Sequence, residues 1–159
     1  MLYRLYQPED FTAIYALEEN CFRRPHRFTR RFMRQLVQSP NGATWMAVED
    51  TGTLAGFAIV EWTASDQGMI AYIETLEVRA EDRRQGVGAE LLRRLIGSAS
   101  EVASVVLLLH VAEDNQPARL LYAAHGFLEQ GREKNYYGRN RDALVLALSL
   151  DIAGQPHAD

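Results

Sequence analysis

The segment with the clearest chemistry is Arg83–Gly88 (Arg-Arg-Gln-Gly-Val-Gly), which stands between an expected strand and an expected helix. The first turn of a helix has unpaired N–H groups and a partial positive charge, and glycine lets the backbone approach a ligand closely. The two arginines add counter-charge, so the segment suits a diphosphate. An ordinary tight turn is the competing interpretation. The segment lacks the Gly-Lys-Ser/Thr of a Walker A loop and the third glycine of the dinucleotide fingerprint.

The elements expected around this segment predict an α/β fold with a mixed sheet of the α+β kind. An apolar stripe through Val87, Leu91 and Leu95 predicts the helix, and the continuous apolar run Val105–Leu109 predicts a strand covered on both faces. Short connections predict that the three preceding strands are antiparallel. The expected strands span 2–6, 43–49, 54–62, 69–78, 105–109, 127 onward and 142–150, and the expected helices span 8–22, 29 to the turn at 39–42, 86–102 and 115–126.

These elements follow the order β-α-α-β-β-β-α-β-α-β-β, and 159 residues is the usual size of one domain. We expect a single domain over residues 1–150, with helices flanking a central mixed sheet, and a polar, disordered tail over 151–159. The lone cysteine, the missing signal peptide and the absence of a membrane-length apolar run predict a cytoplasmic protein without membrane contact. The four histidines and Cys21 have no ligand spacing, so we expect no metal site.

The charges are unevenly distributed. The net charge of −4 argues against a nucleic-acid partner. Six of the sixteen arginines nevertheless fall within Arg23–Arg34, a stretch that contains no acid. This stretch is either a solvated helix face or a basic rim that attracts an acidic substrate or the phosphates of a cofactor.

The chain resembles the GNAT superfamily of acetyltransferases, whose signature is Gln/Arg-x-x-Gly-x-Gly/Ala. Arg83, Gly86 and Gly88 fill this signature, and Asn115–Phe127 fits a second segment of the superfamily. The resemblance covers about residues 1–150 and implies acetyl-CoA as cosubstrate, with no metal. The cofactor-binding residues that it implies are Arg83, Arg84, Gln85, Gly86, Val87, Gly88 and Ala89 for the pyrophosphate, Leu76 and Val78 for the pantetheine arm, and Asn115 and Tyr122 elsewhere on the cofactor.

Acetylation of an amine requires a base for the amine proton, stabilisation of the thioester oxygen, and an acid for the leaving thiolate. The segments that contain Tyr72 and His110 closely resemble those of protein N-terminal acetyltransferases of the NatE and NatF type. That resemblance implies that Tyr72 and His110 are the catalytic pair and take the proton through a water. It also implies that Tyr122 is the general acid, with inward helix packing as its alternative. Bacterial ribosomal-protein alanine acetyltransferases, which the chain also resembles, have a glutamate where this chain has His110.

Glu74 and Glu77 are competing bases on the strand that contains Tyr72. Some small-amine acetyltransferases use a carboxylate in this region. Glu74 alternatively attracts a cationic amine as part of the substrate site, or is simply solvated.

The resemblance also implies a site for the acceptor. Tyr136 and Tyr137 match a tyrosine pair that holds the first substrate residues, although an aromatic pair can also stiffen a hairpin. Pro25 and Phe28 match the pocket for the first side chain, but the basic residues beside them depart from that largely apolar pocket. A preference for an initiator methionine is therefore not expected, and an acidic residue near the substrate terminus is the hypothesis that follows.

The sequence thus predicts an acetyl-CoA-dependent N-acetyltransferase whose acceptor is the α-amino group of a protein or peptide, attacked directly after water-mediated deprotonation. The first alternative is a small-amine or polyamine acetyltransferase. The second is an acyl-CoA-binding module without catalysis, because fold alone does not determine function.

Overall fold

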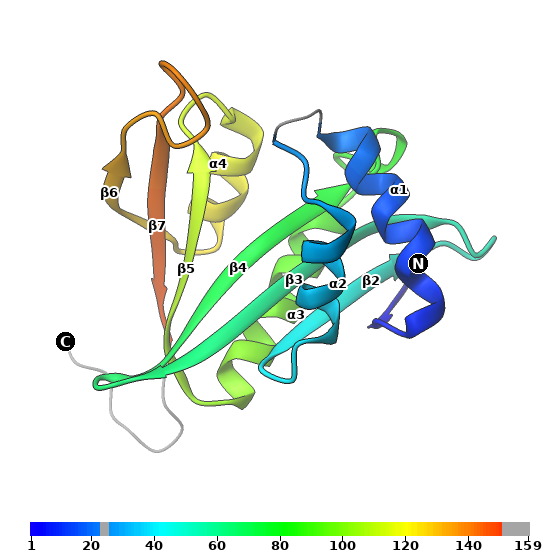
Figure 1. Cartoon of the computed structure of the whole chain (residues 1–159), viewed down its shortest axis with the longest axis horizontal. Coiled ribbons are helices and arrows are strands. Elements are labelled where there is room, and N and C mark those ends of the chain that lie inside the picture. The colour runs from blue at the N-terminus through cyan, green and yellow to red at the C-terminus, as the bar shows by residue number, and fades with distance from the viewer. Residues whose placement is uncertain (23–25, 151–159) are drawn as a thin grey trace. The chain divides into compact units, whose positions relative to one another are not determined.

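The computed structural model describes residues 1–22 and 26–150. Its strands form one mixed sheet in the order β1-β2-β3-β4-β5-β7-β6, and the expected order of elements is confirmed (Figure 1). Pro25 and the expected disordered tail lie outside the described residues. The elements are β1 (Leu2–Leu5), α1 (Phe11–Cys21), α2 (Arg30–Gln38), β2 (Gly42–Val48), β3 (Leu54–Ser65), β4 (Gly68–Val78), α3 (Val87–Glu101), β5 (Ser104–Ala112), α4 (Gln116–Ala124), β6 (Leu128–Glu133) and β7 (Ala143–Ser149).

Side-chain caps begin two of the helices, α2 and α4, where the sequence predicts them. The hydroxyl of Thr29 accepts a hydrogen bond from the backbone N–H of Phe32 at 3.1 Å and begins α2. The Asn115 carboxamide accepts from the N–H of Ala118 at 3.3 Å and begins α4. These local contacts explain why the helix boundaries agree closely with the sequence pattern.

The chain divides into two compact units, each described separately below. The first unit comprises Met1–Glu61 and Glu74–Ser98, and the second comprises Trp62–Ile73 and the chain from Ala99 onward. Strand β4 runs through both, so that Tyr72 belongs to the second unit and Glu74 to the first.

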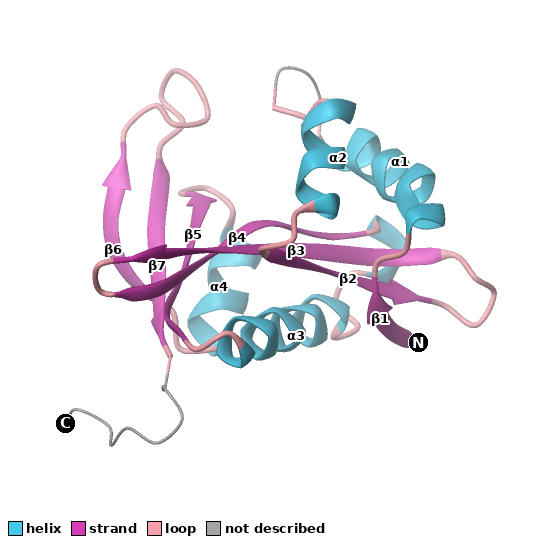
Figure 2. Ribbon diagram, turned by 60° about the horizontal axis from the view of Figure 1, so that its bottom comes forward, coloured by secondary structure: helices cyan, strands magenta, loops and turns pink. Residues whose placement is uncertain are grey.

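In the first unit, α1 and α2 cover one face of the sheet and α3 covers the other (Figure 2). The core between α1, α2 and the sheet contains Ile14, Met33 and Phe57, which are fully buried. On the opposite face, α3 approaches β3 closely, because a Cβ on Gly56 would lie 3.2 Å from Leu91 Cδ1. Burial of these large apolar side chains is the main stabilising contribution of the unit.

In the second unit, β5 is the central strand. It pairs in parallel with β4 over Met69–Tyr72 and antiparallel with β7, which in turn pairs antiparallel with β6. The expectation that both faces of this strand are covered is wrong: Leu107, Leu109 and Val111 are buried, but the alternate residues are only half-buried. The half-buried face is the one that contains His110, so a polar side chain there does not carry the full cost of burial.

The first unit also buries two carboxyl groups. Glu18 of α1 and Glu77 of β4 are 1% and 3% exposed. Burial is the main cause that raises the pKa of Glu77 well above its ordinary value, and the hydrogen bond and the charge of Glu18 raise it further. A proton held by Glu77 can be donated to Glu18, whose second oxygen accepts the N–H of Phe28 at 3.0 Å. The protonated pair therefore holds the segment before α2 next to the sheet.

We expect the stability of the protein to fall as the pH rises, because the pKa of Glu77 is raised in the folded state. The contribution of the protonated acid is fully present below the ordinary pKa of 4.5 and is lost as the pH rises through the folded-state value. Glu77→Gln keeps a neutral hydrogen-bonding group and should raise the free energy of unfolding at pH 8 by on the order of 1–3 kcal/mol. Chemical unfolding at pH 5 and pH 8 measures this difference. Glu19→Gln on the exposed side of α1 is the control, and an unchanged pH dependence in Glu77→Gln would contradict the assignment.

Candidate functional site

The loop Arg83–Gly88 has the geometry of an anion-binding turn. Arg84 and Gly86 have φ values of 62° and 82°, and α3 begins at Val87. Alternation of left-handed and ordinary residues turns successive N–H groups toward one side, which forms a concave anion site. A Cβ on Gly86 would meet no atom within 4 Å, so the backbone here is open to a ligand. The residues of the loop therefore suit the pyrophosphate of acetyl-CoA.

The two arginines of this loop differ. The Arg83 guanidinium donates to the carbonyl of Val78 at 3.0 Å and braces the loop against the end of β4. Arg84 is exposed and its charge faces solvent. Arg84 is therefore the better candidate for a direct contact with phosphate, and Arg83 has a bracing role.

Three other residues predicted to bind the cofactor have known positions in the structure, whereas their contacts with the cofactor stay predictions. Leu76 and Val78 lie at the end of β4, past Tyr72, where the described pairing with β5 stops. The carbonyl of Val78 already accepts from Arg83. Asn115 caps α4, as its sequence predicts, and its contact with the cofactor stays a prediction.

Tyr72 and His110 lie on neighbouring strands of the second unit and are hydrogen-bonded. The Tyr72 hydroxyl is 2.6 Å from His110 Nδ1, and His110 Nε2 is 2.9 Å from Glu133 Oε1. The Tyr136 ring stacks on the imidazole with 4.4 Å between centroids and 4° between planes. The structure thus brings together three residues that the sequence predicts, and adds Glu133.

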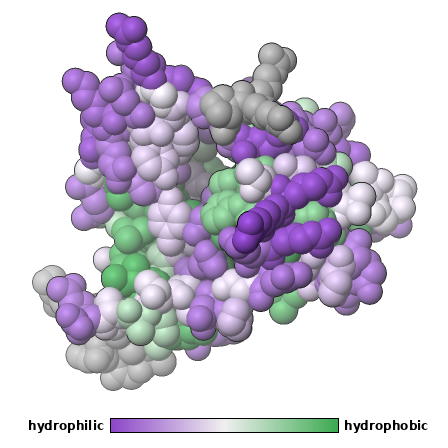
Figure 3. Space-filling view, in the orientation of Figure 1, coloured by the Kyte–Doolittle hydropathy of each residue, from purple (hydrophilic) through white to green (hydrophobic). Residues whose placement is uncertain are grey.

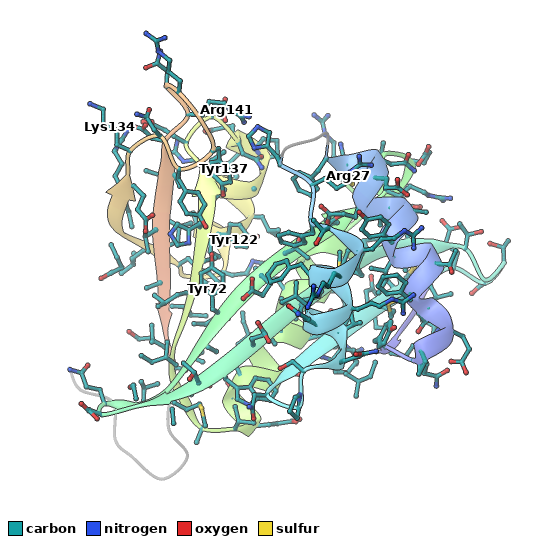
Figure 4. The ribbon with its side chains drawn as sticks, viewed as in Figure 1. Arg27, Tyr72, Tyr122, Lys134, Tyr137 and Arg141 are labelled. Carbon is teal, nitrogen blue, oxygen red and sulfur yellow. The ribbon has the colours of Figure 1, made fainter. Side chains whose placement is uncertain are left out.

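Tyr122 and Tyr137 lie near one another in the same unit (Figure 4). Tyr122 is 7% exposed, and burial followed by the charge of Tyr137 raises the pKa of its hydroxyl. Burial and Tyr136 raise the pKa of Tyr137 to about 12. Tyr122 therefore stays protonated at neutral pH, the state that a proton donor needs. Its ring also packs on Phe127 at 5.5 Å, so the packing role named as its alternative is real.

Glu74 is paired with Glu61 of β3 in the first unit. Burial raises the pKa of Glu74 to about 7, and the hydrogen bond and the charge of Glu61 contribute to the shift. A carboxyl group with this pKa can take or give a proton near neutral pH. The structure therefore keeps Glu74 as a candidate for proton transfer or for contact with a cationic amine.

The described arginines of the basic stretch lie mostly on neighbouring side chains. Arg30 and Arg34 stack over the rings of Tyr15 and Phe11 at 4.7 and 3.8 Å, and Arg27 pairs with Glu19 at 3.1 Å. Figure 3 shows hydrophilic side chains crossing an apolar area over α2. Cation–π contacts of this kind stabilise the surface of α2. They also occupy guanidinium groups that a basic rim would need for binding a ligand.

Phe28 is fixed through its backbone. Its N–H donates to Glu18, its carbonyl accepts from the Tyr15 hydroxyl at 2.9 Å, and its ring meets Phe32 edge-on at 5.1 Å. Its predicted contact with the substrate stays a prediction, as does that of Pro25, which lies outside the described residues.

The described part of the chain contains neither a metal site nor a membrane-spanning helix. Within residues 1–22 and 26–150, no group of three or more histidine, cysteine or acidic side chains could hold a metal ion. In the same part of the chain, no helix is long and apolar enough to cross a membrane. The cytoplasmic location stays a prediction.

Sequence reasoning missed Glu133 and Glu61. Glu133 directly precedes Lys134 and the tyrosine pair, but its contact with His110 depends on the registers of β5, β7 and β6. Glu61 and Glu74 lie on the neighbouring strands β3 and β4, and their contact is known only once these strands are placed side by side. Local sequence patterns therefore predict neither the contact of Glu133 with His110 nor that of Glu61 with Glu74.

The family model and the related proteins that match this chain all describe acetyltransferases. The model of the acetyltransferase (GNAT) family matches residues 9–127. A Bacillus subtilis (strain 168) protein named for the N-acetylation of an alanine of ribosomal protein bS18 is 31% identical over 145 residues, 90% of this chain and 91% of its own. The Escherichia coli (strain K12) ribosomal protein bS18-alanine N-acetyltransferase is 30% identical over 149 residues, 90% and 93% of the two chains. Streptothricin acetyltransferase of Streptomyces lavendulae is 34% identical over 100 residues, 63% of this chain and 52% of that protein.

A solved structure has the same fold. The crystal structure of Arabidopsis thaliana NAA60 in complex with acetyl-CoA superposes with a TM-score of 0.84 at 22% identity, covering 94% of this chain and 98% of that chain. At this identity the likeness establishes the fold.

The loop geometry makes a prediction about Gly86. Alanine at a φ of 82° is strained, so Gly86→Ala should lower the free energy of unfolding by about 1 kcal/mol and weaken the binding of coenzyme A by about tenfold. Gly97→Ala is the matched control, because Gly97 lies inside α3 in open space, and alanine there should stabilise the protein by about 0.5–1 kcal/mol. Calorimetric titration with coenzyme A measures the binding. Equal affinity in the two variants would exclude the loop from the phosphate site.

Proposed function

The chain belongs to the acetyltransferase (GNAT) family, and from this premise we propose that it transfers acetyl from acetyl-CoA to the α-amino group of a protein or peptide N-terminus. That the chain is an acetyl-CoA-dependent N-acetyltransferase follows from the family. The nature of the acceptor is the proposal. The observation that carries it is the hydrogen bond of 2.6 Å between Tyr72 and His110, beside the ring of Tyr136.

The Tyr72–His110 pair suits an α-amine because of proton affinity. A terminal α-amine has a pKa of about 8, so most of it is protonated at neutral pH and must lose a proton before it attacks. Histidine is the side chain that accepts a proton in this range. The ammonium proton passes through a water to the Tyr72–His110 pair. The nitrogen lone pair then forms a bond to the thioester carbonyl carbon.

Tyr122 is the proposed acid for the second half of the reaction. The C–S bond breaks as the carbonyl reforms, and the electron pair of that bond leaves on sulfur. The Tyr122 hydroxyl donates its proton to the thiolate, and the raised pKa of Tyr122 keeps that proton available. The second proton of the attacking nitrogen is lost as the amide forms and restores the Tyr122 hydroxyl, so the products are a neutral amide and the free thiol of coenzyme A.

Two observations support an N-terminal acceptor over other amines. The Bacillus subtilis and Escherichia coli relatives match 90% of the chain and are named for the N-acetylation of an alanine of ribosomal protein bS18. The Tyr136–Tyr137 pair, with rings 4.9 Å apart and nearly perpendicular, adjoins His110 and offers hydroxyl groups to a peptide backbone. A ribosomal-protein terminus is the acceptor class that we propose to test first.

The second candidate acceptor is a small cationic amine. The Glu61–Glu74 pair is the specific observation in its favour, because one or both carboxylates can attract a cation. The partial match to streptothricin acetyltransferase favours the same candidate.

A panel of acceptors separates these candidates. The protein is incubated with acetyl-CoA and either peptides with ribosomal-protein N-termini, polyamines or aminoglycosides, and the release of free thiol is followed. We expect turnover of the peptides that disappears when the α-amine is blocked and persists when lysine side chains are blocked. Turnover of polyamines alone would replace the proposal by the small-amine alternative. Binding of acetyl-CoA without turnover of any acceptor would support the non-catalytic module.

Tyr122→Phe tests the acid. The variant keeps the ring packing on Phe127 and loses only the hydroxyl, so kcat should fall by roughly 100-fold while the affinity for acetyl-CoA changes less than about threefold. Steady-state kinetics and calorimetry measure the two quantities. An unchanged kcat would remove Tyr122 from the mechanism.

Glu74→Gln tests whether Glu74 contacts the amine or takes its proton. Below pH 7 the wild-type Glu74 becomes neutral, so the KM for a cationic amine should rise as the pH falls through about 7. Glu74→Gln should abolish that dependence and leave kcat for the peptide within about threefold of the wild type. A loss of peptide kcat comparable to that of a His110 variant would instead assign the base role to Glu74.

A further inference from the structure

We propose that Glu133 is a positioning residue that holds His110 in the one tautomer able to accept the Tyr72 proton. This inference rests on the proposed function, because it concerns the same proton route. It goes beyond that function because Glu133 is not among the site residues that the sequence predicts. It also specifies that the proton moves from Tyr72 to His110.

The tautomer follows from the two hydrogen bonds of the imidazole. Glu133 Oε1 lies 2.9 Å from His110 Nε2, and an ionised carboxylate can only accept a hydrogen bond. Nε2 must therefore carry a proton. In the neutral imidazole, Nδ1 then has a free lone pair, and its partner at 2.6 Å, the Tyr72 hydroxyl, is the donor.

The strand registers of the second unit place Glu133 on the same face of the sheet as His110. His110 pairs with Val145, and Glu133 pairs with Ala143, two residues along the same strand. Directly paired residues, and residues two apart on one strand, point to the same face of a sheet. A register shift between Glu129 and Gly131 sets which residues of β6 share that face.

The neighbours of Glu133 keep it aimed at the imidazole. Successive side chains alternate in a strand, and Arg132 is held in ion pairs with Glu113 and Asp142 at 2.6 and 3.4 Å. The stack of Tyr136 on His110 fixes the plane of the ring. The ionisable side chains that face His110 are thus Tyr72 from β4, Glu133 from β6 and Tyr136 from the β6–β7 connection.

The tautomer sets the direction of proton transfer. The amine proton passes through a water to the Tyr72 oxygen, and the Tyr72 proton moves to His110 Nδ1 in the same step. The tyrosine ends neutral, the imidazole becomes a cation, and the cation faces the Glu133 carboxylate. A carboxylate placed in this way both orients an imidazole and stabilises its protonated form.

Glu133→Ala tests the inference, with Glu129→Ala on the same strand as the matched control. Glu133 is half-exposed, so its removal should leave the fold intact. We expect kcat for the peptide acceptor to fall by roughly tenfold or more with the KM for acetyl-CoA unchanged. The nitrogen-15 NMR signals of His110 should change from the Nε2–H tautomer to a mixture.

The outcomes divide clearly. A loss of kcat together with a changed His110 tautomer in Glu133→Ala, but not in Glu129→Ala, supports the inference. An unchanged tautomer, or a changed tautomer with full turnover, overturns it. His110→Ala is assayed in parallel: full peptide turnover without His110 overturns the proposed proton route itself, whereas a loss in His110→Ala alone overturns only the role of Glu133.

Discussion

Strand β5 pairs in parallel with β4 on one side and antiparallel with β7 on the other, and every contact of His110 depends on these two registers. The parallel register aligns Tyr72 with Leu108, two residues before His110, so the phenol and the imidazole share a face. The antiparallel register aligns His110 with Val145 and, through β6, brings Glu133 to the same face. A slip of one residue in either pairing would turn these side chains to opposite faces. The sheet register is therefore the physical basis of the proposed proton route.

Acidic side chains in this protein differ in role because they differ in surroundings. Glu77 and Glu18 are almost fully buried, and burial raises the pKa of Glu77, so this pair has a structural role. Glu74 and Glu61 are less buried, and the pKa of Glu74 near 7 keeps that pair responsive to pH or to a cation. Glu133 is half-exposed and lies 2.9 Å from His110 Nε2, which suits a group that accepts a hydrogen bond from the imidazole. Burial thus sorts the carboxyl groups that the sequence alone presents as equivalent.

The sequence predicts the order of elements, the helix caps and the turn at Arg83–Gly88, because periodicity and capping residues are local properties. It also places Tyr72 and His110 on strands, whereas their role as a catalytic pair is implied only by the resemblance to N-terminal acetyltransferases. It predicts wrongly that β5 is covered on both faces, since an apolar run does not say which alternate residues meet solvent. It does not predict the contact of Glu133 with His110, because the β5–β7 and β6–β7 registers and the register shift in β6 decide that contact. The sequence leaves the arginines of Arg23–Arg34 as either a solvated helix face or a basic rim that attracts a ligand, whereas Arg30 and Arg34 stack on aromatic rings of α1.

The coupling of Tyr72 and His110 is the central claim, and a double-mutant cycle measures it most directly. Values of kcat/KM for an N-terminal peptide are determined for wild type, Tyr72→Phe, His110→Ala and the double variant. If one proton route runs through both side chains, the double variant should be no slower than the slower single variant, because either change already breaks the route. Losses that multiply in the double variant would show that Tyr72 and His110 act independently and would contradict the account.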